Sequence, residues 1–219
     1  MMGKLKYLVI HCTATPEGRE VSGAEIRSWH TNPVSKGGRG WKQVGYTDLF
    51  HLNGGVERLV DNNEDANVDP WEITNGVAGY NSVSRHIVYA GGVAKDGKTP
   101  KDTRTVCQKR ALEKYVKDFH RRFPGVRIVG HNELAAKACP SFDVQKWLVS
   151  IGIRQSKSDH GHERTLELDI WRRPSGRSDG PSDVGPHGQE GEGGSGKGES
   201  RRGDRADRQH GARHAYPDR

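Results

Sequence analysis

The chain lacks the cysteine content of a disulfide-stabilised protein and the long apolar runs of a membrane protein. Its three cysteines, Cys12, Cys107 and Cys139, are odd in number and widely spaced, which indicates folding in a reducing compartment. The apolar run at residues 7–10 is too short for a signal peptide, and no other run approaches the length of a membrane span. We therefore expect a protein made in the cytoplasm, without a signal peptide and without membrane insertion.

Hydrophobic residues are also scarce, at 32% of the 219 residues, and the shortage is concentrated at one end of the chain. From residue 154 onward Gly, Arg, Asp, Ser and His dominate, and apolar residues are almost confined to residues 166–171. Such a composition cannot bury enough apolar surface to offset the conformational entropy of the chain. We therefore predict one compact domain at residues 1–153 and a disordered tail at residues 154–219.

The formal net charge is +7, and most of the excess lies in the first 153 residues because the tail is nearly balanced in charge. A modest positive field suits anionic partners such as nucleic acid or a bacterial cell wall, although a solvated basic surface is the simplest explanation. The chain carries no recognisable nucleic-acid-binding motif, so we expect no specific nucleic-acid partner.

Three helix starts and several short strands can be read from the residue pattern. Ser22 with Glu25, and Thr105 with Gln108, have the spacing of capping boxes, and Asp143 is a candidate N-cap. Apolar runs rich in β-forming residues predict strands at residues 7–10, 46–52, 56–60, 86–89 and 126–129, with a hairpin turn at Asn53-Gly54. Helices and strands do not alternate strictly, so we predict an α/β fold with a single central mixed sheet flanked by helices.

Two of the predicted strands end at a histidine, His11 and His131, and Cys139 lies just before the last helix. Strand ends meet at one edge of a sheet, and two imidazoles with one thiolate form a three-ligand zinc site that leaves one position open, as catalytic sites do. Taken alone, each histidine could equally be a hydrogen-bonded surface or core residue, and Cys139 a buried small hydrophobe. Cys12 alternates to the opposite strand face from His11, so burial is expected for it rather than metal ligation.

Three segments resemble the type 2 N-acetylmuramoyl-L-alanine amidases, a family that includes phage lysozyme-like zinc amidases and the animal peptidoglycan recognition proteins. The segments are His11-Cys12-Thr13-Ala14-Thr15, Val44-Gly45-Tyr46, and the stretch from His131 that ends in Lys137-Ala138-Cys139-Pro140-Ser141-Phe142-Asp143. The resemblance covers about residues 4–153, and the lysine-to-aspartate run is its most specific part. It implies an amidase-like fold with His11, His131 and Cys139 as Zn²⁺ ligands.

The resemblance also implies the reaction, which is hydrolysis of the amide bond between the lactyl group of N-acetylmuramic acid and L-alanine in peptidoglycan. Tyr46 and Lys137 match catalytic residues of the phage-type enzymes, and each would stabilise the developing oxyanion by roughly 3–4 kcal/mol. One branch of the family uses a catalytic glutamate on the central strand, two residues beyond a glycine. This chain has His86 at the glycine position and Val88 at the glutamate position, so that glutamate is absent. We predict substrate contacts for Asn81 and for His86, although His86 could instead only fill the sheet surface.

The predicted partner is therefore peptidoglycan or a soluble muropeptide, bound by a monomer that acts on the wall after release or on muropeptides in the bacterial cytoplasm. Two alternatives stay open at this point. A recognition module would bind muropeptide without cutting it, but such members typically lose the cysteine ligand that Cys139 matches. A basic nucleic-acid-binding protein would use the tail and need no zinc.

Of the two tryptophans in this part of the chain, Trp29 is expected in the core and Trp41 at the cleft.

Overall fold

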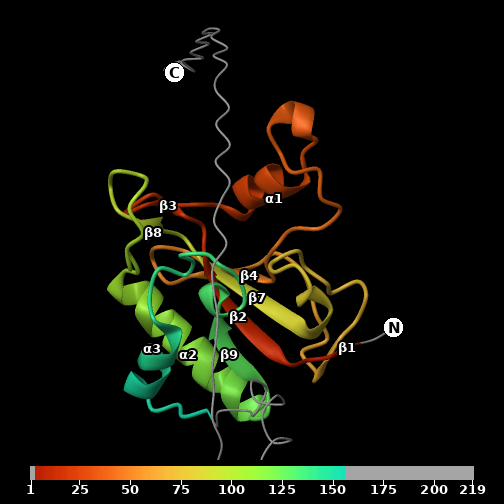
Figure 1. The fold of residues 1–219 in the computed structure, drawn as a ribbon, viewed down its shortest axis with the longest axis vertical. Coiled ribbons are helices and arrows are strands. Elements are labelled where there is room, and N and C mark those ends of the chain that lie inside the picture. The colour runs from red at the N-terminus through yellow and green to blue at the C-terminus, as the bar shows by residue number, and fades with distance from the viewer. Residues whose placement is uncertain (1–2, 156–219) are drawn as a thin grey trace, which may run out of the picture. The chain divides into compact units, whose positions relative to one another are not determined.

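The computed structural model describes residues 3–155, and a five-stranded sheet forms its centre (Figure 1). In spatial order the strands are β5 (Val56–Arg58), β4 (Asp48–Phe50), β7 (Ser84–Tyr89), β2 (Tyr7–Cys12) and β9 (Arg127–Gly130). Strands β4, β7, β2 and β9 are parallel, whereas β5 pairs antiparallel with β4. The predicted α/β fold with one central mixed sheet is thus confirmed.

Shorter elements lie around this sheet. β1 (Gly3–Lys4) pairs antiparallel with β6 (Asn67–Val68), and β3 (Thr15–Pro16) pairs parallel with β8 (Gly92–Val93). The connections contain the 3-10 helices η1 (Val34–Lys36), η2 (Asn81–Val83) and η3 (His131–Glu133). Of these, η3 matters most for function because it begins directly after β9 and starts with a predicted metal ligand.

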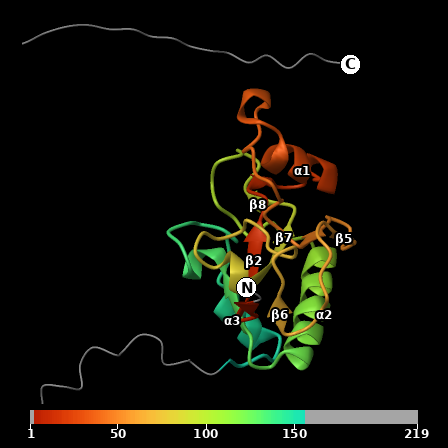
Figure 2. The same ribbon diagram turned by 90° about the vertical axis from the view of Figure 1, so that its right-hand side faces the viewer.

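Alternation along β2 divides the core between the two faces of the sheet. Leu8 and Ile10 pack on one face with α2 (Val106–Arg122) and α3 (Val144–Ser150), whose buried residues join the same cluster. The other face carries a separate cluster that includes residues of α1 (Gly23–Thr31). Both views show α1 well apart from α2 and α3 (Figures 1 and 2). His11 alternates to the α1 side, away from the largest apolar cluster.

The helices begin where the capping residues predict. The Ser22 and Thr105 hydroxyls each accept a hydrogen bond from the backbone N–H three residues later, and the Glu25 and Gln108 side chains bond back to complete both capping boxes. The Asp143 carboxylate accepts the Lys146 N–H at 2.9 Å at the start of α3. These bonds satisfy N–H groups that the first turn of a helix leaves without partners.

The predicted strands at residues 46–52 and 56–60 are both shorter in the structure. The Leu59 and Val60 N–H groups converge on the Thr47 carbonyl oxygen, at 2.8 and 3.3 Å. Two donors on one acceptor interrupt the regular ladder in the manner of a bulge, so pairing is confined to β4 and β5. Tyr46 therefore lies in a loop at the sheet edge and not within a strand.

The predicted tail lies, from residue 156 onward, outside the described residues. Within the described part of the chain, no helix combines the length and apolar character needed to cross a bilayer.

Candidate metal centre

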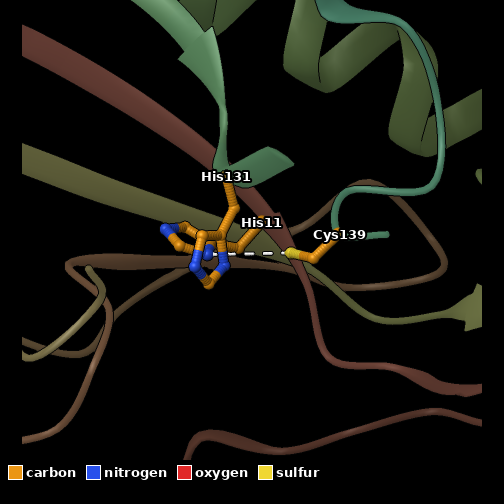
Figure 3. A group of neighbouring side chains, drawn as sticks. All are labelled: His11, His131 and Cys139. Carbon is orange, nitrogen blue, oxygen red and sulfur yellow. Dashed lines mark hydrogen bonds between the residues drawn. The ribbon is translucent and has the colours of Figure 1, made fainter. Parts of the chain in front are cut away.

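Three side chains from separate parts of the sequence converge at one edge of the central sheet. His11 stands near the carboxyl end of β2, His131 opens η3 after β9, and Cys139 lies in the loop before α3. Parallel pairing of β2 with β9 places Ile10 opposite Gly130, so the two histidines leave the sheet at the same edge. One ligand atom from each residue lies within 4.8 Å of the other two (Figure 3). The predicted ligand set is therefore brought together.

The loop that carries Cys139 is held by contacts on both sides of the cysteine. The Asn132 N–H donates to the Cys139 carbonyl at 2.8 Å, and the buried Tyr89 hydroxyl donates to the Pro140 carbonyl at 2.6 Å. The guanidinium carbon of Arg104 lies 3.3 Å from the ring centre of Phe142. A side chain at Gly130 would come within 2.9 Å of Pro140, so glycine there permits the close approach of the loop.

The two histidines are held in the neutral form, which is the form that binds a metal. Burial, followed by the proximity of His86 and His131, lowers the pKa of His11 well below its ordinary value. Burial also lowers the pKa of His131, with a further contribution from the Lys137 ammonium. His11 is 1% exposed and presents Nδ1 to the Cys139 sulfur at 3.7 Å. The His11 ring is therefore uncharged at neutral pH.

Cys139 has a second cysteine as its neighbour. The Cys12 backbone N–H donates to the Cys139 sulfur at 3.2 Å, a contact that favours the thiolate. The neighbouring Cys12 side chain and burial raise the pKa of Cys139 above its ordinary value. The Cys12 side chain itself is 5% exposed and packs in the apolar cluster on the far face of β2, as predicted.

The three-residue cluster opens into a cavity of about 400 Å³ that also contains both predicted catalytic side chains. Tyr46 and Lys137 line it together with His131 and Cys139. The Tyr46 ring lies 5.2 Å from that of His11, centre to centre. Burial raises the pKa of Tyr46 above its ordinary value, and the nearby thiols add to this, so the phenol stays protonated and can donate a hydrogen bond.

The cavity wall also contains Trp29, His30 and Arg39, for which sequence reasoning predicted no role in catalysis or binding. The buried His30 accepts the Gly45 N–H on Nδ1 at 3.1 Å, and its ring lies 5.3 Å from that of Tyr46. His30 thus supports the loop that carries Tyr46. Trp29 packs partly against the apolar cluster on the α1 side of the sheet, as expected, and also lines the cavity, whereas Trp41 stacks against His30, with ring centres 4.9 Å apart. His30 follows Ile26 by four residues, so helical spacing could have indicated its burial on α1 but not its place beside Tyr46.

We expect the metal-free protein to lose stability as the pH falls from 6.5 to 5, and His30 to account for part of the loss. Burial, and after it the nearby Arg39, lowers the pKa of His30 to about 4, whereas a histidine in the unfolded chain has the ordinary pKa of 6.5. A histidine whose pKa is lowered in the folded state contributes its full stabilisation above pH 6.5. Each pH unit below 6.5 lowers the free energy of unfolding by up to about 1.4 kcal/mol. Urea unfolding in the presence of a chelator, repeated between pH 6.5 and 5, measures how the unfolding free energy depends on pH. Most carboxylates titrate below this range, so they contribute little to the slope.

The matched variant for this prediction is His30→Asn, which keeps an acceptor for the Gly45 N–H but cannot be protonated. Its unfolding free energy should fall less steeply with decreasing pH than that of the wild type. Equal slopes in the two proteins would contradict the assignment to His30.

The two predicted substrate contacts lie elsewhere. His86 is 0% exposed and its Nδ1 lies 3.1 Å from Nε2 of His11, so in this conformation it has no surface to offer a substrate. Burial lowers the pKa of His86 to about 3, which keeps it neutral. Asn81 precedes β7, at the opposite end of that strand from the cavity, and its side chain accepts the Val77 N–H at 2.8 Å. His86 therefore lies behind His11 and Asn81 makes a loop contact, and substrate binding by either residue stays a prediction.

Known proteins resemble this chain in both sequence and structure. The sequence model of the N-acetylmuramoyl-L-alanine amidase family matches residues 1–142. The endolysin of Enterobacteria phage K11 is 34% identical over 139 residues, which are 64% of this chain and 82% of the relative. The endolysin of Klebsiella phage KP32 is 32% identical over 154 residues, 70% of this chain and 91% of the relative. Among solved structures, the Ph2119 endolysin from Thermus scotoductus MAT2119 bacteriophage Ph2119 has a TM-score of 0.51 at 26% identity, covering 68% of this chain and 86% of that one.

Proposed function

The chain belongs to the N-acetylmuramoyl-L-alanine amidase family, and we propose that it is a zinc-dependent peptidoglycan amidase. The bond cut is the amide between the lactyl group of N-acetylmuramic acid and the L-alanine of the stem peptide. The observation that carries the proposal is the convergence of His11, His131 and Cys139 beside a cavity that also holds Tyr46 and Lys137.

The donor set suits Zn²⁺. Two neutral imidazoles and a cysteine sulfur are ligands that zinc prefers, and their atoms lie within 4.8 Å of one another. Three protein ligands leave a fourth position for water or substrate, and the adjoining cavity of about 400 Å³ provides the room. A structural zinc site would instead be closed by a fourth protein ligand.

Zn²⁺ in an open site of this kind acts as a Lewis acid and makes water nucleophilic near neutral pH. The protein supplies the remaining stabilisation. Tyr46, protonated because its pKa is raised, donates a hydrogen bond to the carbonyl oxygen as negative charge develops there. The exposed Lys137 places a positive charge on the same side of the cavity. Both groups stabilise the transition state more than the neutral substrate, which is the requirement for faster turnover.

The full-length phage relatives support an endolysin-like role for the domain at residues 1–153. In that role the substrate is the polymeric wall, which the protein meets after release from the cytoplasm. The positive net charge favours encounter with an anionic wall surface.

Product analysis on purified peptidoglycan tests the proposal. The expected result is new amino-terminal alanine without new reducing sugar ends, since an amidase leaves the glycan strands intact. New reducing ends would indicate a glycosidase, and other new amino-terminal residues a peptidase. If the protein binds muropeptide but no new amine appears, it is a recognition module and not an amidase.

A further inference from the structure

His86 occupies an unusual position for a histidine, at the centre of the sheet behind the metal centre. It lies on β7, which is flanked by β4 and β2, and is 0% exposed. In the β2–β7 register it stands opposite Val9, two residues before His11 on the same face of the sheet. Its Nδ1 is 3.1 Å from Nε2 of His11, so one hydrogen bond joins the two rings.

The surroundings of His86 are shaped to its imidazole. A side chain on Gly76 would overlap the His86 ring, so the glycine leaves the space that the ring fills. Among the described residues, Nε2 of His86 has no hydrogen-bond partner. A buried polar atom without a partner costs about 1–3 kcal/mol, so an apolar residue would serve the core better. Packing alone does not account for a histidine here.

The two nitrogens of His11 face different groups. Nδ1 points to the Cys139 sulfur at 3.7 Å, and Nε2 points to His86. If Nδ1 is to bind a metal, it must be unprotonated, and the ring proton must then reside on Nε2. An acceptor at Nε2 stabilises that tautomer, and Nδ1 of neutral His86 is such an acceptor.

We propose that His86 is a positioning residue for the metal centre, which by accepting the Nε2–H of His11 holds the ring in the orientation and tautomer that direct Nδ1 at the metal. This inference rests on the proposed zinc function. Hydrogen bonds that orient a metal ligand typically change the metal affinity by about 10- to 100-fold. The partner is here another histidine on the neighbouring strand.

The first test reads the tautomer of His11 in the full-length, metal-free protein at neutral pH. Nitrogen-15 NMR of the imidazole rings should find His11 protonated at Nε2 in the wild type. In His86→Leu, which removes the acceptor but keeps an apolar core residue, a substantial population should be protonated at Nδ1. A single Nε2–H tautomer in His86→Leu would overturn the proposal, and this readout needs no zinc and no activity.

The second test measures the zinc dissociation constant by competition with a chromophoric chelator. His86→Leu should bind zinc about 10- to 100-fold more weakly than the wild type. His86→Asn, which keeps an acceptor at the δ position, should recover most of the affinity, and a merely structural role would not predict this recovery. Equal affinity of wild type and His86→Leu would overturn the inference alone. Failure of the wild type to bind zinc would instead overturn the proposed function.

Gly76→Ala provides an independent approach should His86→Leu fail to fold. The added methyl group displaces the His86 ring without changing any polar group. It should shift the His11 tautomer and weaken zinc binding in the same direction as His86→Leu. An unchanged tautomer and unchanged affinity in folded Gly76→Ala would contradict the positioning role.

Discussion

Replacing Cys139 by alanine is expected to abolish both stoichiometric zinc binding and amidase activity. The thiolate is the only anionic donor among the three proposed ligands, and the two neutral imidazoles that remain cannot offset the charge of Zn²⁺. Since loss of a contact outside the ligand shell already costs about 10- to 100-fold, loss of a ligand should cost roughly 10³-fold or more in zinc affinity. Metal analysis after dialysis and the rate at which new amino-terminal alanine appears on peptidoglycan measure the two effects.

Cys107→Ala is the matched control for this variant. Cys107 is an exposed free cysteine in the first turn of α2, away from the cavity lining. This protein should keep one zinc per chain and full activity. Retention of zinc and turnover by Cys139→Ala would contradict the assigned ligand set, whereas loss of both in Cys107→Ala would indicate general damage from removing a thiol.

Tyr46→Phe is expected to lower kcat by about 10²- to 10³-fold while zinc content stays at one per chain. The substitution removes the hydroxyl that donates to the developing oxyanion and leaves the ring that packs beside His11 and His30. Because the interaction forms mainly in the transition state, kcat and kcat/KM should fall together. Steady-state kinetics on a soluble muropeptide, with metal analysis of the same sample, separate this outcome from loss of zinc.

Tyr80→Phe serves as the control for Tyr46→Phe, because Tyr80 packs edge-on against Tyr7 and does not line the cavity.

Lys137→Met should resemble Tyr46→Phe in its effect on kcat. If both side chains stabilise the same oxygen, the double variant should lose less than the sum of the two single losses in activation free energy. Normal turnover by Tyr46→Phe would remove the tyrosine from the proposed chemistry.

Much of the fold could be predicted from local signals that do not depend on the rest of the chain. A capping box needs only two side chains three residues apart, so the start of α2 at Thr105 followed from four residues. The ends of β4 and β5 could not be predicted, because they depend on how Leu59 and Val60 meet Thr47 across the hairpin. That arrangement is a tertiary contact with no sequence pattern of its own.

The site was predictable to a similar degree. Histidines at strand ends, with Cys139 just before the last helix, suggested the three ligands, since parallel strands end at a common edge. The family resemblance then made the assignment specific. The contact between His11 and His86 was not foreseen, because it depends on strand order, which places β7 beside β2. The position of His30 beneath Tyr46 likewise follows from the docking of α1 and not from its own sequence.

Zinc reconstitution of the metal-free protein tests the central claim most directly. Protein stripped by a chelator should produce no new amino-terminal alanine on peptidoglycan, and added Zn²⁺ should restore the rate linearly until one ion is bound per chain. Mg²⁺ or Ca²⁺ should not substitute, because these ions prefer oxygen ligands over imidazole and thiolate. Full activity in the thoroughly stripped protein, or no gain at one bound zinc, would contradict the account.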